Sequence, residues 1–148
     1  MDLPSATVPV FRLNQAGEHD PADDLASPCV RLAYSFRLDL QAGGAPQGSV
    51  FGLIDTGADV SFMDQRLVPA DAIAESETST LTIAGLGRAL VFLIQVNFVG
   101  SNRLFTTQVV PVPLTHDRPH RFVIGRSLLQ ATRFVFNRGA GIQSLEVF

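Results

Sequence analysis

Short apolar segments separated by turn residues are the feature that most limits how this sequence can fold. Val30 to Leu40 alternates, with apolar side chains at every second position from Leu32 onward, as a half-buried strand should. Further strand-like segments follow at short intervals: 49–54, 81–83, 89–98, 104–112, 122–124, 133–137 and 144–148. Many short strands at this spacing predict an all-β barrel or sandwich. One short helix is expected at Arg126–Ala131.

Turn signals indicate how neighbouring segments pair. AGGAPQG should join 30–40 to 49–54 as a hairpin, and AGLGR should join 81–83 to 89–98. Residues 61–68 could hold a short turn or strand, and 71–80 are polar and loop-like. Residues 1–29 are predicted to be an irregular N-terminal extension with room for a short strand at Val8–Leu13. Residues 30–148 are predicted to form the folded domain.

Composition narrows the class of protein. The chain has 148 residues, 46% of them hydrophobic, which suits one globular domain rather than a disordered chain. The formal net charge of −3 gives no electrostatic reason to expect a nucleic acid or a membrane as partner. The apolar stretch 89–99 is too short to span a bilayer, and the first residues do not resemble a signal peptide. Cys29, the single cysteine, is expected to be a buried hydrophobe, and a cytoplasmic location is predicted.

The segment FGLIDTGAD, at 51–59, carries the clearest chemical signal. Asp55 directly follows an apolar strand, where a carboxylate is costly to bury without compensation. Gly57 allows a tight turn, and the Thr56 hydroxyl can hold that turn by hydrogen bonds. The combination fits a carboxylate displayed on a rigid loop at the floor of a cleft. The alternative is a strand-ending Asx turn, in which Asp55 only binds nearby amides.

FGLIDTGAD resembles the active-site loop of the retropepsin-like aspartic proteases. Their pattern is two apolar residues followed by Asp-Thr/Ser-Gly-Ala and often Asp. A second family signature, two apolar residues, Gly, Arg, Asp or Asn and two apolar residues, is matched by FVIGRSLL at 122–129, except at Ser127. A glycine hairpin lies between the two motifs, as in the family. Over 30–148 the resemblance implies a closed retropepsin-like (acid protease) β-barrel with one short C-terminal helix.

The resemblance also implies a mechanism and explains why DTG occurs once. Each subunit of a homodimer contributes one aspartate, here Asp55, and the pair hydrolyses peptide bonds of a polypeptide substrate. Two carboxylates about 3 Å apart cannot both ionise, an effect for which aspartic proteases are the standard example. The ionised partner takes a proton from a water that attacks the scissile carbonyl. No cofactor or metal is implied.

Further roles follow from the resemblance alone. Thr56 would hydrogen-bond across the dimer axis, and Gly57 would present its carbonyl to the substrate. Ala58 is typical of the retroviral loop, and Asp59 would form a buried ion pair with Arg126. The hairpin Ile83–Arg88 is the flap candidate, with substrate contacts from Ile83, Ala84, Gly85, Leu86 and Gly87. Arg126 could instead be a solvated residue at the helix start, and the hairpin could be an ordinary turn.

Other constellations are weaker. His116 and His120 have the i, i+4 spacing of helical zinc ligands, but Pro119 between them disfavours a helix. Asp59 and Asp64 could form a carboxylate pair, although neither follows a strand as Asp55 does. Ser61 lacks the GxSxG setting of a serine nucleophile.

Two questions about function stay open at the level of sequence. The rival to a protease is a non-catalytic peptide-binding or dimerisation module with the same fold. Residues 1–29 could serve as a propeptide or as an interaction arm.

Overall fold

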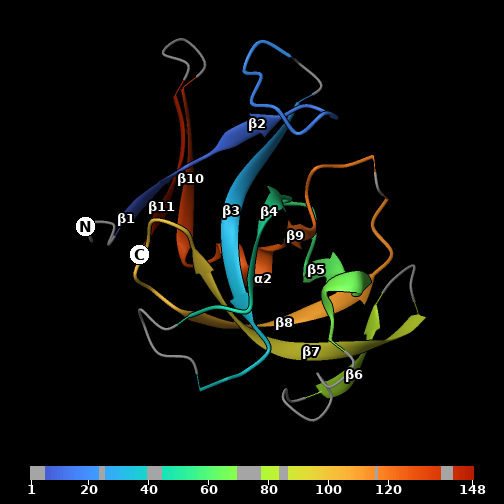
Figure 1. Ribbon diagram of the computed structural model, residues 1–148. Coiled ribbons are helices and arrows are strands. Elements are labelled where there is room, and N and C mark those ends of the chain that lie inside the picture. Colours follow the sequence, from blue (N-terminus) through green and yellow to red (C-terminus); the bar gives the residue numbers. More distant parts are fainter. Residues whose placement is uncertain are drawn as a thin grey trace.

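The computed structural model describes residues 6–23, 26–39, 45–69, 78–83, 87–115, 117–137 and 142–148 (Figure 1). At 78–83, 136–137 and 142 only the backbone is described. The expectation of an all-β chain is confirmed, since strands dominate these residues. The one α-helix among them is short, α2 (Arg126–Leu129). It begins where expected and ends two residues earlier than predicted.

Six strands close into a barrel. The larger sheet has the order β2-β3-β4-β9-β5-β8-β7-β6, and β3 also pairs with β7, which closes the ring from β3 to β7. Its strands are β2 (Phe11–Leu13), β3 (Ser27–Ser35), β4 (Gly48–Ile54), β5 (Ser61–Asp64), β6 (Thr78–Ile83), β7 (Gly87–Phe98), β8 (Phe105–Val112) and β9 (Phe122–Ile124). Both predicted hairpins are present, β3 with β4 and β6 with β7, each antiparallel.

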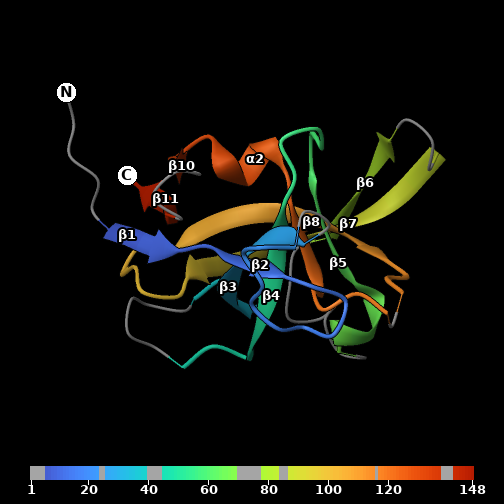
Figure 2. The ribbon, with the colours of Figure 1, turned by 90° about the horizontal axis from the view of Figure 1, so that it is seen from above.

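A second sheet joins the two ends of the chain. β1 (Ala6–Pro9) pairs with β11 (Ile142–Val147), which pairs in turn with β10 (Thr132–Asn137), all antiparallel. The register Ala6↔Val147 brings the described termini together, and Figures 1 and 2 show β1 and β11 on the same side of the molecule. β10 and β11 thus form the hairpin that the two C-terminal apolar segments predicted.

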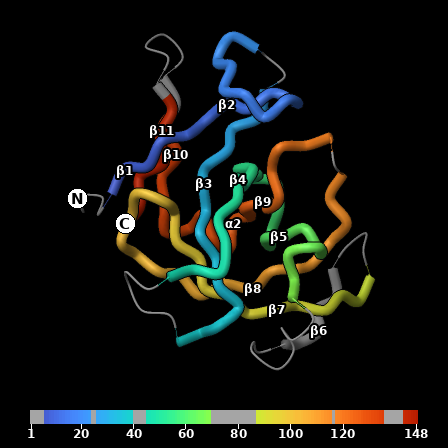
Figure 3. The backbone as a smooth tube through the Cα atoms, in the orientation of Figure 1, coloured from blue at the N-terminus to red at the C-terminus, as the bar shows by residue number. Residues whose placement is uncertain are grey.

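The barrel interior is apolar because alternate side chains of each strand point inward. On β4 and β9 the inward positions include Ile54, Phe122 and Ile124, each buried. Gly52 lies between them, and a Cβ there would come within 2.8 Å of Leu32 Cδ1. The paired strands β4, β9 and β5 carry this face, and Figure 3 shows them side by side.

The N-terminal residues contribute to the same core. β1 and β2 lie within 1–29, where the sequence left room for one short strand at Val8–Leu13. Val8, Val10 and Leu13 are buried, and the first two belong to the main apolar cluster. The division into 1–29 and 30–148 stays a prediction. Val8 and Val10 lie on one side of that boundary and pack in the same apolar cluster as residues on the other side.

β3 ends at Ser35, earlier than the expected Leu40. The Phe36 N–H donates to Gln47 Oε1, and the Arg37 N–H donates to Ser35 Oγ at 3.1 Å. Side-chain acceptors therefore replace the strand ladder at this point, and the chain turns away.

Two further expectations concern single features. Cys29 is fully buried, as expected, and burial raises the pKa of its thiol to about 12. Among the described residues, no helix is long and apolar enough to cross a membrane.

Candidate active site

The loop that follows β4 displays Asp55. The Asp55 N–H donates to the Ile124 carbonyl at 3.0 Å, so the first loop residue is still tied to β9. Its Oδ1 accepts the Gly57 N–H at 3.0 Å, which is the Asx turn considered from sequence. Asp55 is half-buried, whereas Thr56 and Gly57 are exposed. The carboxylate is therefore held in one orientation at the surface of the barrel.

The loop is fixed to the segment 125–127. The Arg126 N–H donates to the Ala58 carbonyl at 2.8 Å, and the Ser127 N–H donates to the Asp59 carbonyl at 3.2 Å. A Cβ on Gly125 would lie 2.2 Å from the Val60 carbonyl oxygen, so only glycine allows this approach. The two sequence motifs thus meet in space, and the second one supports the first.

Ser61 supplies one more link between these segments. Its hydroxyl, fully buried, accepts the Gly125 N–H at 3.0 Å. Ser61, which the sequence offered as a possible nucleophile, therefore supports the loop through this hydrogen bond.

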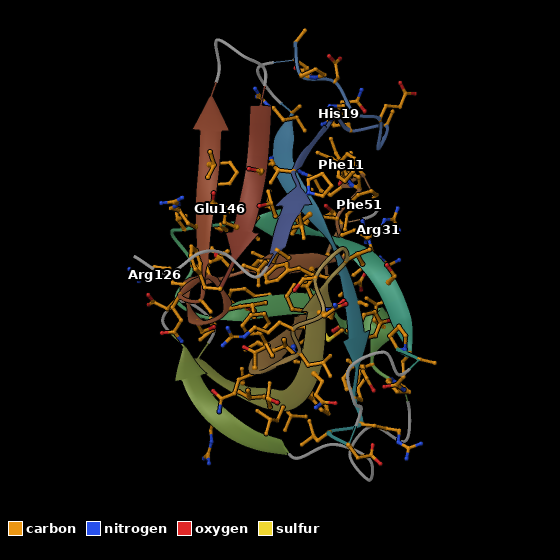
Figure 4. The ribbon with its side chains drawn as sticks, turned by 90° about the vertical axis from the view of Figure 1, so that its left-hand side faces the viewer. Phe11, His19, Arg31, Phe51, Arg126 and Glu146 are labelled. Atoms are coloured by element: carbon orange, nitrogen blue, oxygen red, sulfur yellow. The ribbon has the colours of Figure 1, made fainter. Side chains whose placement is uncertain are left out.

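Asp59 and Arg126 form the expected ion pair. Their side chains are 79% and 62% exposed, so the expectation that this pair is buried within one chain is wrong. Exposed pairs typically contribute about 0–1 kcal/mol. Figure 4 shows Arg126 at the side of the molecule away from the cluster of Phe11, Arg31 and Phe51.

An apolar row runs beside Asp55 on the outward face of the barrel. The registers Leu53↔Val123 and Phe62↔Val123 place three half-buried side chains next to one another. Leu53 precedes Asp55 by two residues, so both lie on this face. Phe62 and Val123 were missed from sequence, because only the pairing of β4, β9 and β5 makes them neighbours of Leu53.

One end of this face is already covered. The Phe11 ring packs edge-on against Phe51 at 5.9 Å, and the Arg31 guanidinium lies 4.4 Å from the Phe51 ring centre (Figure 4). Of these two neighbours of Phe51, Phe11 belongs to β2 and Arg31 to β3. The row Leu53, Val123 and Phe62 therefore leads away from Phe51 and towards β9 and β5.

The flap candidate is described only in part. The register Ile83↔Gly87 closes the β6–β7 hairpin, and Gly87 has φ +71°, the left-handed conformation that favours glycine. Ala84, Gly85 and Leu86 lie outside the described residues. The hairpin itself is present where the sequence predicted it.

Asp64 is not part of a carboxylate pair. Its buried side chain accepts hydrogen bonds from Arg66 Nε at 3.0 Å and from Arg121 at 2.8 Å. The Arg66 hydrogen bonds, followed by those of Arg121, hold the pKa of Asp64 far below its usual range. Asp59 and Asp64 are thus each bound to arginine.

The histidine pair gains no support as a metal site. His120 is 6% exposed, and burial, followed by the charges of Arg118 and Arg121, lowers its pKa. Its Nδ1 has no partner among the described residues, and His116 lies outside them. Among the residues that the structure describes, no three His, Cys, Asp or Glu side chains gather as metal ligands would.

Comparisons with known proteins agree with this architecture. A family model described as retroviral aspartyl protease matches residues 29–136. A retropepsin-like aspartic protease from Rickettsia conorii is similar in structure, with TM-score 0.51 and 14% identity over 99% of this chain and 97% of that one. A comparison with curated protein sequences gave no significant match.

Two further solved structures have lower TM-scores. The EIAV protease in complex with the inhibitor HBY-793 has TM-score 0.43 and 16% identity, covering 73% of this chain and 89% of its own. The retroviral protease-like domain of Ddi1 from Leishmania major has TM-score 0.44 and 16% identity, covering 82% and 94%.

Proposed function

Because the chain belongs to the retroviral aspartyl protease family, we propose that it is a homodimeric aspartic endopeptidase with one Asp55 from each subunit. The observation that carries the proposal is the setting of Asp55. The carboxylate stands at the end of a barrel strand, on an exposed loop that 125–127 supports through backbone hydrogen bonds. Rigid placement of a reacting group at the surface is what catalysis requires.

The two carboxylates that the sequence offered near Asp55 support the need for a second subunit. Asp59 is bound to Arg126 and Asp64 to Arg66 and Arg121, so neither is available as a partner of Asp55. Exposure of Thr56 and Gly57 leaves the loop accessible to another copy of the same loop. A two-fold axis beside Asp55 would bring two identical carboxylates together.

The pair would act through a shared proton. The ionised Asp55 takes a proton from water, and the resulting hydroxide adds to the scissile carbonyl carbon. The protonated Asp55 of the other subunit donates its proton to the carbonyl oxygen. Collapse of the tetrahedral intermediate breaks the C–N bond, and the amine leaves with a proton from the dyad. Titration then belongs to the pair rather than to either residue.

The remaining loop residues take supporting roles in this proposal. Thr56 would hydrogen-bond to the partner loop below the dyad, and the Gly57 carbonyl would bind the substrate backbone. Ala58 anchors the loop, because its carbonyl accepts the Arg126 N–H. Loss of either member of the Asp59–Arg126 ion pair would cost more if the partner subunit covers the pair.

The substrate groove would be largely apolar. Leu53, Val123 and Phe62 would contact alternate side chains of an extended peptide. The hairpin Ile83–Arg88 would close over it as a flap and exclude water.

Replacing the aspartate tests the proposal. Asp55→Asn should lower cleavage of a peptide library by about 10³-fold or more, with the dimer retained in sedimentation analysis. Asp39→Asn, an exposed carboxylate paired with exposed Arg37, is the matched control and should cleave normally. Hydrolysis by the Asp55→Asn protein, or by a strictly monomeric wild type, would contradict the mechanism.

A peptide-binding or dimerisation module is the second candidate. The hydrogen bond from the Gly57 N–H to Asp55 Oδ1 is the observation in its favour, because it gives the aspartate a structural role. Binding of a pepstatin-type inhibitor and peptide cleavage between pH 4 and 7 separate the two candidates. Absence of both, in a confirmed dimer, would favour the module.

A further inference from the structure

A shallow pocket that is open to solvent and rich in arginine, called the arginine cavity below, lies beside the short 3-10 helix η1 (Gln65–Leu67). Its volume is about 410 Å³, and its lining residues are Asp64, Arg66, Leu67, Arg118 and Arg121. The loop around Asp55 contributes none of them. The lining holds three arginines and one carboxylate, which gives it excess positive charge.

Asp64 holds two of the three arginines in place. Its side chain is 1% exposed and forms ion pairs with Arg66 and with Arg121, the latter at 2.8 Å. Arg121 also donates to the carbonyls of Thr115, at 2.9 Å, and of Arg118. The Arg121 guanidinium is therefore fixed at the cavity wall by three acceptors, and the single charge of Asp64 cannot neutralise both arginines.

Arg118 adds a third positive charge to the cavity. It is exposed, and it forms no ion pair among the described residues. Its neighbour Asp117 is exposed, does not line the cavity and hydrogen-bonds to Thr115, and the charges of Arg118 and Arg121 help to lower the pKa of its carboxyl, so it offsets part of their positive charge. A planar guanidinium beside a polar cavity suits a carboxylate, which it can bind through two parallel hydrogen bonds.

The cavity lies on the same outward face as Asp55. Arg121 directly precedes β9, and its carbonyl accepts the Asp64 N–H at 2.9 Å, so the strand alternation extends to it and places its side chain on the same face as Val123. The Arg121 N–H donates to the Phe51 carbonyl at 3.0 Å, and Phe51 precedes Asp55 by four residues. Four strand residues span about 13 Å, which an extended peptide also covers in about four residues.

We propose that this arginine cavity binds an acidic side chain of the polypeptide substrate, about four residues from the scissile bond. The proposal rests on the proposed protease function. Leu53 and Val123 lie between the cavity and Asp55, and Phe11 covers Phe51, so the open path from the aspartate runs along β9 to Arg121. Substrates would thus combine an apolar segment at the cleaved bond with a carboxylate farther along the chain.

Binding and cleavage are measured separately. Short labelled peptides carry Glu, Gln or Lys at one position at a time, and fluorescence anisotropy reports their binding to Asp55→Asn protein. The Glu peptide should bind about tenfold more tightly than its Gln counterpart at the position that reaches the cavity. Arg118→Gln should reduce this ratio severalfold, and Arg118→Glu should shift preference to the Lys peptide. Arg37→Gln removes an exposed arginine outside the cavity lining and should keep the Glu preference.

The outcomes that overturn the proposal are distinct from failure of the protease function. Equal binding of Glu and Gln peptides at every position overturns it, even if wild type cleaves peptides. Displacement of the Glu peptide by inorganic phosphate or acetylglutamate at the peptide's own affinity also overturns it, because the cavity would then be a small-anion site. If binding shows a Glu preference that depends on Arg118 while the wild-type protein cleaves no peptide, the result supports the cavity assignment and contradicts the protease function.

Discussion

The Ser61 hydroxyl and the Gly125 N–H form a buried hydrogen bond of 3.0 Å between residues 64 positions apart in the chain. This bond joins the segment after Asp55 to the segment before Arg126. Both residues stand where the chain leaves or enters a strand of the barrel. The position of the Asp55 loop thus depends on a polar contact inside the fold.

Ser61→Ala should destabilise the protein by about 1–3 kcal/mol, because the buried Gly125 N–H loses its acceptor. Circular dichroism during urea unfolding measures the change. Ser49→Ala, at an exposed position of β4, should stay within about 0.5 kcal/mol. Equal stability of Ser61→Ala and wild type would show that another acceptor takes the Gly125 N–H.

Asp64→Asn should lower the free energy of unfolding at pH 7 by about 3 kcal/mol, since it leaves arginines without their buried partner. The folded-state pKa of Asp64 lies below the ordinary value of 3.8. Its carboxylate therefore stabilises the fold above pH 3.8, and this contribution is lost as the pH falls towards the folded pKa. The difference between wild type and Asp64→Asn should shrink below pH 4.

Urea unfolding from pH 7 down to acid measures this difference. Asp39→Asn removes a carboxylate that is 72% exposed and should change stability little at any pH. A difference between wild type and Asp64→Asn that stays constant down to pH 2 would contradict the assigned ion pairs.

Arg126→Gln should change the stability of the isolated chain by no more than about 1 kcal/mol, because the Arg126–Asp59 pair is exposed. A dimer that covers the pair would make the effect larger, so the loss should grow with protein concentration. Unfolding over a range of concentrations measures this. A large loss in the dilute, monomeric protein would mean that the pair supports the loop within one chain.

Removal of residues 1–13 should cost more than about 4 kcal/mol, because Val8, Val10 and Leu13 are buried and each contributes about 1.5–3 kcal/mol. The strand β11 would also lose its pairing with β1. Removal of residues 1–5 is the control and should leave both strands intact. Full stability after removal of 1–13 would instead favour the predicted division, in which residues 1–29 form a separate extension.

Local sequence signals predicted much of the fold. β9 has the predicted bounds, and β4 and β8 begin within one residue of them, because alternation and turn residues act over a few positions. The predicted end of β3 was wrong, because the Gln47 side chain, from the far side of the hairpin, accepts a hydrogen bond from the Phe36 N–H. The expected burial of the Asp59–Arg126 pair was also wrong, and the solvated Arg126 considered as the alternative is closer to the structure, because a motif specifies partners but not their solvent access.

The sequence by itself determined the family, the all-β class and the loop of Asp55, because each depends on residues close together in the chain. Tertiary structure alone decided that Ser61 supports Gly125, that Val123 lies between Leu53 and Phe62, and that Arg66, Arg118 and Arg121 share one cavity. These neighbours come from segments that are far apart in the chain. Barrel closure sets their register, and the burial of alternate side chains decides which of them point outward together.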